Sequence, residues 1–172
     1  NQLRNPSFEA DADGTIPPTG WKDATGDVEV DDAEAYDGSK SMLIAAAQPI
    51  STRGYQSISL KKGQFIRLSA ACKATTAGYA ALRLRLNGGD YGWSTAFASF
   101  HSGGGTWELL SGVYGPVTSD TTGYIYLRKM TAGATDIWFD QAVFEVRNTL
   151  YSTRYVVRDV TGVDKTVADF TC

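Results

Sequence analysis

The chain has 172 residues, a formal net charge of −3 and 42% hydrophobic residues. A chain of this length can bury one sizeable core, whereas a second full domain would be cramped. The acidic balance disfavours nucleic acid as a partner, because binding nucleic acid needs a concentrated basic face. A local basic groove is still compatible with a net negative charge. No stretch approaches the roughly 18 apolar residues that a membrane-spanning helix needs.

Composition and periodicity favour an all-β fold. The chain contains 18 glycines, nine tyrosines and four tryptophans, and it has few long apolar patterns of helical period. Turn signals separate stretches that alternate as strands do, namely 28–30, 41–46, 55–60, 65–74, 79–86, 106–114, 124–128 and 136–145. Regular short strands of this kind predict a two-sheet antiparallel β-sandwich.

The stretch from Asp136 to Glu145 is predicted to be the strand that completes the sandwich. Strict alternation divides it into two faces, one with Ile137, Phe139, Gln141 and Val143, the other with Trp138, Asp140, Ala142 and Phe144. Both faces are largely apolar, so the strand is expected to lie between two layers. Asp140 then needs a cation, because burying an unpaired charge is costly.

Several short motifs follow one another along the chain. They are Asn5-Pro6-Ser7-Phe8-Glu9, Gly20-Trp21, Gly38-Ser39-Lys40-Ser41-Met42, Lys62-Gly63-Gln64, Gly105-Thr106-Trp107 and Trp138-Phe139-Asp140. In order and spacing this set resembles the family four/nine carbohydrate-binding modules and their galactose-binding-like jelly-roll relatives, from residue 3 to residue 146. The resemblance implies a jelly-roll β-sandwich over residues 1–147 with a short C-terminal extension, 148–172.

The resemblance also implies a function. It implies a non-catalytic module that recognises a polysaccharide or a cell-surface glycan, located outside the cell or on a virion or cell surface. The same scaffold serves in phage, adhesin and other surface proteins, so the alternative is a structural or host-attachment domain of a virion or surface assembly. The extension 148–172 is interpreted as a linker to a neighbouring domain or as a segment that docks a subunit.

A structural calcium ion is a further implication of the resemblance. In the family this ion is often held by the opening glutamate, a backbone carbonyl near the Gly-Ser-Lys-Ser turn and the aspartate of the last strand. The resemblance implies that the corresponding ligands here are Glu9, Lys40 and Asp140. Calcium takes six to eight oxygen ligands, drawn from carboxylates and carbonyls. The alternative is that Asp140 caps a turn or pairs with an arginine.

Outward-facing residues suggest a ligand-binding surface. Aromatic rings suit the C–H faces of a pyranose, while arginine and glutamine bind hydroxyls, carboxylates or sulfates. The candidates are Tyr55, Gln56, Arg67, Arg83, Arg85, Tyr91, Trp93, Tyr124, Tyr126 and Arg128. Trp93 is the expected stacking platform, and an anionic glycan is a candidate ligand if the strand-borne arginines share one sheet. The alternative is cross-strand packing for the aromatics and weak surface ion pairs for the arginines.

Evidence for catalysis is sparse. His101 is the single histidine, the glycines 103–105 lack the Lys-Ser/Thr of a phosphate-binding loop, and there is no G-x-S-x-G motif. A pair of carboxylates for glycoside cleavage stays open, because its members need only meet in space, and Asp90, Glu108 and Asp120 are unplaced. The chain is expected not to be an enzyme.

Overall fold

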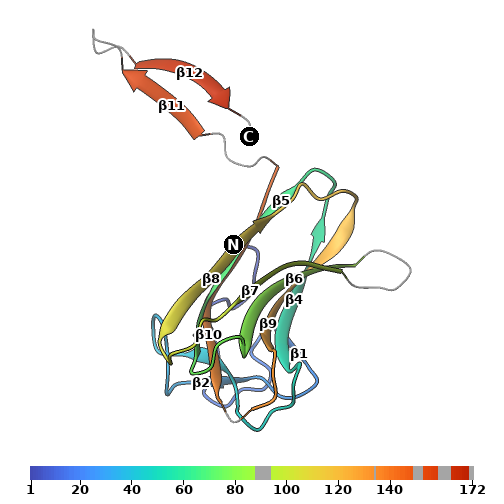
Figure 1. Cartoon of the computed structure of the whole chain (residues 1–172), viewed down its shortest axis with the longest axis vertical. Helices are drawn as coiled ribbons and strands as arrows, with labels where there is room; N and C mark the ends of the chain where they lie inside the picture. The colour runs from blue at the N-terminus through green and yellow to red at the C-terminus, as the bar shows by residue number, and fades with distance from the viewer. Residues whose placement is uncertain (88–93, 134, 149–152, 159–163, 171–172) are drawn as a thin grey trace.

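The computed structural model describes residues 1–87, 94–133, 135–148, 153–158 and 164–170. The two-sheet antiparallel sandwich is confirmed (Figure 1). The first sheet has the order β1 (Lys22–Ala24), β4 (Arg53–Leu60), β9 (Thr121–Lys129), β6 (Ala80–Asn87) and β7 (Ser94–Phe100). The second has the order β2 (Glu29–Asp31), β3 (Ser41–Ile44), β10 (Ile137–Arg147), β5 (Phe65–Ala74) and β8 (Trp107–Tyr114).

Alternation located most strands to within a few residues, and β5 at its observed bounds. Two strands were missed. β1 consists of Lys-Asp-Ala, three residues with no apolar alternation. β7 has the sequence Ser-Thr-Ala-Phe-Ala-Ser-Phe, which is too rich in small residues to show a clear period. No helix among the described residues is long and apolar enough to cross a membrane.

The core lies between the two sheets. Its largest fully buried side chains include Phe8, Met42, Ile44, Ile66, Leu68, Leu82, Leu84, Phe139 and Phe144. Each such side chain contributes about 1.5–3 kcal/mol when it leaves water. Cys72 belongs to this cluster, and burial raises the pKa of its thiol well above the usual value.

The predicted division of β10 into two faces is wrong beyond Asp140. The pairing of β10 with β5 shifts register between Asp140 and Val143, and Gln141 has a positive φ of 47°. This bulge inserts one residue and reverses which side chains point inward. Ile137, Phe139, Ala142 and Phe144 are therefore all fully buried in the same core. The strand has one apolar face, formed by odd-numbered residues before the bulge and by even-numbered residues after it. Strict alternation therefore makes both faces look apolar.

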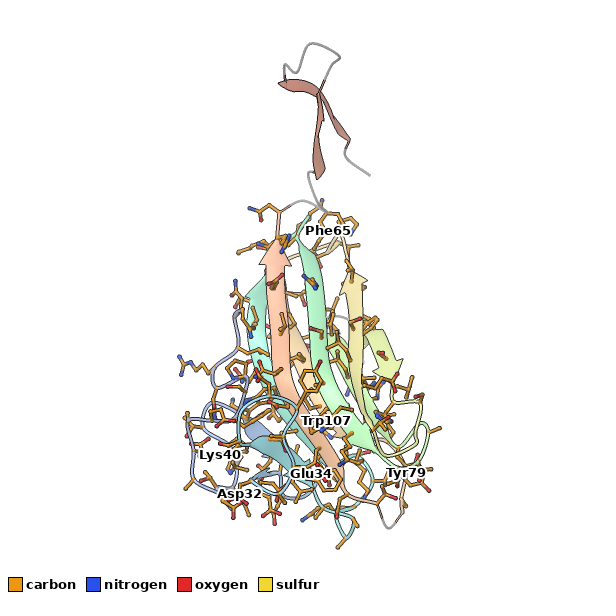
Figure 2. The ribbon with its side chains drawn as sticks, turned by 90° about the vertical axis from the view of Figure 1, so that its left-hand side faces the viewer. Asp32, Glu34, Lys40, Phe65, Tyr79 and Trp107 are labelled. Carbon is orange, nitrogen blue, oxygen red and sulfur yellow. The ribbon has the colours of Figure 1, made fainter. Side chains whose placement is uncertain are left out.

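A loop covers part of the outer face of the second sheet. Glu34 forms an ion pair with Lys73 at 2.6 Å, and the ring of Tyr36 packs on Trp107 with centroids 5.7 Å apart. Figure 2 shows this region, with Glu34 and Trp107 labelled. The loop explains why Asp140 is completely buried although it lies on the side of β10 away from the core.

The N-terminal segment closes the edge of the sandwich. Gln2 N–H donates to the carbonyl of Phe144 at 2.8 Å, and Ala142 N–H donates to the carbonyl of Pro6 at 2.9 Å. These bonds hold the segment against β10, in the second sheet. Two hydrogen bonds between the Arg4 backbone and the Gln56 amide hold it against β4 in the first sheet, so the segment connects the two sheets.

The C-terminal extension contains a separate two-stranded sheet, β11 (Thr153–Arg158) and β12 (Asp164–Phe170), which pair antiparallel. The role of residues 148–172 as a linker or a docking segment for a neighbouring domain or subunit stays a prediction.

Candidate functional site

Three central strands of the first sheet bring aromatic and cationic side chains onto one outward face. The register pairs Tyr55 with Tyr126 and Arg53 with Arg128 across β4 and β9. It pairs Arg83 with Tyr126 and Arg85 with Tyr124 across β6 and β9. Successive side chains of a strand point to opposite faces, so these positions all point away from the core. We call this set, Arg53, Tyr55, Arg83, Arg85, Tyr124, Tyr126 and Arg128, the tyrosine–arginine face.

Tyrosine rings form the centre of this face. The ring centroids of Tyr55 and Tyr126 are 5.5 Å apart, and Tyr124 lies 6.3 Å from each of the two. Tyr124 and Tyr126 are nearly parallel, with 11° between their planes. Tyr126 is only 4% exposed, whereas Tyr55 and Tyr124 are half-buried. Tyr126 is therefore the floor of the cluster, and the other two rings remain accessible to a ligand.

Neutral groups hold two of the arginines in place. Arg53 donates through Nη1 to the carbonyl of Ser51 at 3.0 Å and to the Thr25 hydroxyl at 3.2 Å. Arg128 donates through Nη2 to the Ser51 hydroxyl at 2.6 Å. The guanidinium carbon of Arg53 also lies 5.3 Å from the centroid of the Tyr126 ring, within the range of a cation–π contact. Both guanidinium groups are thus oriented while their charge is not neutralised by these partners.

The charges on this face repel one another. Burial lowers the pKa of Arg128, and the neighbouring Arg83, Arg53 and Arg85 lower it further. Burial also lowers the pKa of Arg83, with a further contribution from Arg85. Like charges directly opposite on adjacent strands, such as Arg53 and Arg128, destabilise a sheet.

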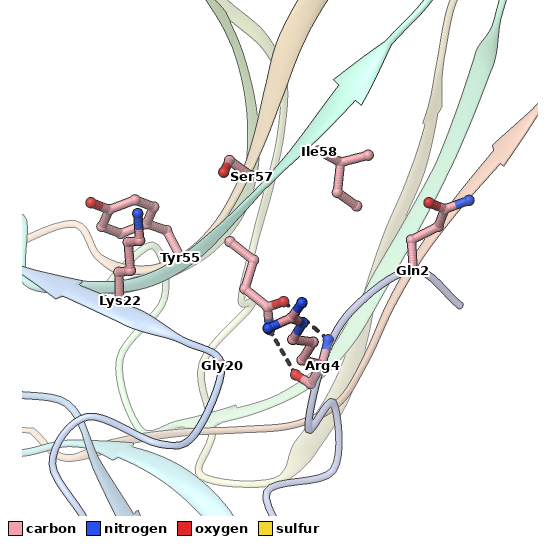
Figure 3. A pocket seen from close by; sticks show the side chains of 8 residues that line it. Gln2, Arg4, Gly20, Lys22, Tyr55, Ser57 and Ile58 are labelled. Carbon is pink, nitrogen blue, oxygen red and sulfur yellow. Dashed lines mark hydrogen bonds between the residues drawn. The ribbon is translucent and has the colours of Figure 1, made fainter.

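A pocket of about 320 Å³ lies over this face. Its described lining consists of Lys22, Arg53, Tyr55, Ser57, Arg85, Tyr124 and Tyr126. A second pocket, of about 390 Å³, shares Lys22, Tyr55 and Ser57 with the first and extends to Gln2, Arg4 and Gly20 at the edge of the sandwich (Figure 3). The two pockets are therefore adjacent, and their described lining residues include no Asp, Glu, His or Cys.

Six of the predicted ligand-binding residues meet on the tyrosine–arginine face, namely Tyr55, Arg83, Arg85, Tyr124, Tyr126 and Arg128. Tyr91 and Trp93 lie outside the described residues, so their role stays a prediction. Arg67 lies on β5 in the second sheet, where its Nη1 is 4.0 Å from Glu145. It is not part of this face.

Gln56 lies outside the tyrosine–arginine face, although it lines the second pocket together with Tyr55. It pairs with Ile125, at a position that faces the opposite side of the sheet, and it is 9% exposed. Its Oε1 accepts the N–H of Arg4 at 3.0 Å and its Nε2 donates to the carbonyl of Arg4 at 2.7 Å (Figure 3). The amide fixes the N-terminal segment, because alternation from Tyr55 turns the next side chain inward.

Sequence reasoning missed Arg53 and Lys22. The strand was predicted to begin at Tyr55, but β4 begins at Arg53, and two-residue alternation places Arg53 beside Tyr55. Gly54 between them lies under the Met42 side chain, where an added Cβ would approach the sulfur to 2.5 Å. Lys22 belongs to β1 and pairs with Tyr55. Extending the alternation by two residues would have found Arg53, whereas nothing in the sequence pointed to Lys22.

The predicted metal ligands Glu9 and Asp140 both contact the loop 36–40. Glu9 accepts the backbone N–H groups of Ser39 and Lys40 at 2.7 and 2.8 Å, and Ser39 lowers the pKa of its carboxyl. Asp140 Oδ2 accepts the N–H groups of Tyr36 and Asp37 at 3.0 and 3.1 Å. Burial raises the pKa of Asp140, and the nearby Glu9 adds to this. The Asp140 bonds fit the alternative of a turn cap, and no salt bridge pairs Asp140 with a cation among the described residues.

This pair of carboxylates does not by itself form a metal centre. Within the described part of the chain, no group of three or more His, Cys, Asp and Glu could hold a metal ion. A calcium ion here would need carbonyl oxygens, such as that of Lys40, to complete its coordination. Gly38 has a φ of 81°, and an added Cβ would meet Glu9 Oε1 at 2.5 Å, so the backbone approaches this carboxylate very closely.

Of the residues considered for catalysis, His101 and Glu108 are neighbours, with 3.8 Å between His101 Nε2 and Glu108 Oε2. Glu108 accepts the N–H and the hydroxyl of Ser102 at 2.7 and 2.8 Å. His101 is buried, with Nδ1 accepting the N–H of Gly103 at 2.8 Å and Nε2 lying 3.0 Å from the carbonyl of Thr106. Asp120 forms an exposed ion pair with Lys61 at 2.8 Å. Asp90 lies outside the described residues. None of these groups is in the described lining of either pocket.

The sandwich and its aromatic and cationic outward face define a β-sandwich binding module. The model of the carbohydrate-binding domain family matches residues 1–133, and the chain belongs to this family. Its role is accordingly the non-catalytic recognition of a glycan. The alternative of a structural or host-attachment domain in a virion or surface assembly is not favoured. No curated protein matches the sequence.

Solved structures show the same fold at low sequence identity. "Family 16 Carbohydrate Binding Module-2" has a TM-score of 0.61 at 20% identity, with 84% of this chain and 99% of that chain covered. "Xylan-Binding Domain from CBM 22" has a TM-score of 0.60 at 16% identity, covering 84% and 94%. A cyclase from Fischerella sp. TAU has a TM-score of 0.60 at 14% identity, covering 84% and 96%. At these identities the likeness concerns the fold, which serves binding modules and enzymes alike.

Proposed function

We propose that this module binds a polysaccharide chain across the tyrosine–arginine face of its first sheet and does not cleave it. The observation that carries this assignment is the grouping of Tyr55, Tyr124 and Tyr126 over a pocket of about 320 Å³ that arginines border. Membership of the carbohydrate-binding domain family supports it. We place the module outside the cell or on a cell surface, where polysaccharides are encountered.

The chemistry of the face suits sugars. The accessible rings of Tyr55 and Tyr124 offer flat apolar area to the C–H faces of pyranose rings. The guanidinium groups donate several hydrogen bonds in a fixed plane, which suits the hydroxyl groups at the ring edges. The adjoining pocket at the β1–β4 edge provides a path along which the chain continues past Lys22. A shallow site of this kind is expected to bind weakly, with a Kd of about 10 µM to 1 mM.

The same lining supports binding without hydrolysis. Glycoside cleavage uses two carboxyl groups on opposite sides of the scissile bond, about 5–10 Å apart. The described residues that line the two pockets include no carboxylate. Glu108 and Asp120 are instead engaged by Ser102 and Lys61.

Binding is tested by calorimetric titration of the full chain with a panel of soluble polysaccharides. Tyr124→Ala should weaken binding at least tenfold, which corresponds to about 1.4 kcal/mol, because it removes a half-buried ring that the ligand would stack on. Tyr36→Ala is the matched control, since it removes a 51% exposed tyrosine from the loop over the other sheet. Unchanged affinity in Tyr124→Ala, or an equal loss in Tyr36→Ala, would place the site elsewhere.

We also propose that a structural calcium ion links Glu9, Asp140 and the carbonyl of Lys40. Support comes from the complete burial of the Asp140 carboxylate without a cationic partner among the described side chains, and from the second carboxylate against the same loop. A bound cation would supply the positive charge that the buried Asp140 carboxylate lacks among the described side chains. The ion would join the N-terminal segment, the loop 36–40 and β10.

A further inference from the structure

The charge on the tyrosine–arginine face is opposite in sign to that of the whole chain. The chain has 16 Lys and Arg against 19 Asp and Glu. Yet Arg53, Arg83, Arg85 and Arg128 are neighbours on three adjacent strands, and Lys22 extends the row from β1. The described lining of the pocket over them includes three cations and no carboxylate.

The arginines of this face carry like charge at neighbouring positions of adjacent strands. Four guanidinium groups on neighbouring positions repel one another, and Arg83 and Arg128 are partly removed from the water that would screen them. Neutral donors such as Asn, Gln or Ser would bind sugar hydroxyls without this repulsion. A surface that gathers like charge in a recess raises the local concentration of oppositely charged ligands. The arrangement is therefore suited to a ligand that brings negative charge.

The geometry also suits planar or tetrahedral oxyanions on a sugar. Arg53 and Arg85 both lie over the Tyr126 ring, at 5.3 and 6.0 Å from its centroid, and both line the pocket. A guanidinium group binds carboxylate or sulfate oxygens through two parallel hydrogen bonds. The accessible Tyr55 and Tyr124 rings adjoin the same recess, so a stacked sugar ring would hold its acidic substituent near these arginines.

We propose that the polysaccharide recognised by this face is anionic, with carboxylate or sulfate groups on its sugar units that pair with Arg53, Arg85 and Lys22. This inference rests on the proposed function and specifies the ligand class of the same site. A single-stranded nucleic acid also combines anionic groups with stackable rings. The family of the chain and its net negative charge favour the polysaccharide.

Matched pairs of polymers that differ only in charge test the inference. Polygalacturonate is compared with its carboxyl-reduced form, and dextran sulfate with dextran, by calorimetric titration at about 0.05 M and about 0.5 M NaCl, where screening lengths are about 14 and 4 Å. At least one charged polymer should bind tenfold or more tighter than its neutral counterpart, and high salt should reduce this preference. The two pairs separate carboxylate recognition from sulfate recognition.

Variants assign the preference to this face. The double variant Arg53→Gln/Arg85→Gln should reduce the tenfold preference to threefold or less. Arg67→Gln is the control with the same chemical change, because Arg67 lies on the second sheet with a half-exposed side chain. A preference that survives the double variant, or that Arg67→Gln also abolishes, overturns the assignment. Melting temperatures show whether each variant is folded.

The outcomes separate the two proposals. Equal binding of charged and neutral polymers overturns the anionic preference and leaves the glycan-binding function standing. Absence of binding to every polymer by the folded protein counts against both. Tighter binding of a single-stranded oligonucleotide than of any polysaccharide would also overturn the inference, because the anions recognised would then be phosphates.

Discussion

Calcium should stabilise the folded module through Glu9 and Asp140. A ligand that binds only the native state stabilises it by RT ln(1 + [L]/Kd), or about 2.7 kcal/mol at a hundredfold excess over Kd. For a domain of this size, 1 kcal/mol changes the melting temperature by about 2–4 °C. The melting temperature in millimolar calcium should therefore exceed that in EDTA by about 5–10 °C, measured by differential scanning calorimetry.

Two substitutions separate the loss of a ligand from the loss of hydrogen bonds. Glu9→Gln retains an oxygen for the N–H groups of Ser39 and Lys40. The Ser39 hydroxyl, which donates to the Glu9 carboxylate in the parent protein, can instead accept from the amide of the glutamine. The stability of Glu9→Gln in EDTA should stay within about 1 kcal/mol of the parent protein. Asp140→Asn retains an acceptor for the loop but loses the bond from Gln141 N–H, at a cost of about 1 kcal/mol.

In calcium, both variants should lose most of the gain that the parent protein shows. Asp32→Asn is the control, because it removes an exposed carboxylate from the loop next to the proposed site. Equal melting temperatures of the parent protein in calcium and EDTA would refute the calcium site. A full calcium response in both Glu9→Gln and Asp140→Asn would refute the choice of ligands.

Three further predictions concern stability and activity. Tyr126→Ala should lower the free energy of unfolding by about 2–4 kcal/mol in urea titrations, because it empties the nearly buried floor of the face, whereas Tyr124→Ala should cost under half as much. Ser102 lowers the pKa of the Glu108 carboxyl. This carboxylate therefore stabilises the fold above the usual pKa of a glutamate, and the stabilisation is lost as pH falls through the lowered value. Glu108→Gln should accordingly be less stable than the parent protein at neutral pH but not in strong acid. Incubation with neutral and acidic polysaccharides should release no reducing ends above background, and turnover that one carboxylate substitution abolishes would contradict this.

Local periodicity was sufficient to predict the all-β class and most of the strands. Alternation also predicted that Tyr124, Tyr126 and Arg128 share a face, and that Arg83 and Arg85 share one, because side chains two residues apart on a strand point the same way. It failed at β10, where the bulge at Gln141 changes the phase. A bulge is stabilised by contacts with other parts of the chain, here the loop 36–40 and the N-terminal segment, so its position is not visible in the period.

The sequence by itself determined which residues of one strand lie side by side, and the tertiary structure decided which strands lie next to each other. Arg53 and Arg128 are 75 positions apart in the chain, yet they are direct partners across β4 and β9. Likewise, the amide of Gln56 is engaged because the N-terminal segment returns to β4. The direction of a side chain follows from local backbone geometry, but the neighbours of a strand depend on how the whole core packs, which no local pattern records.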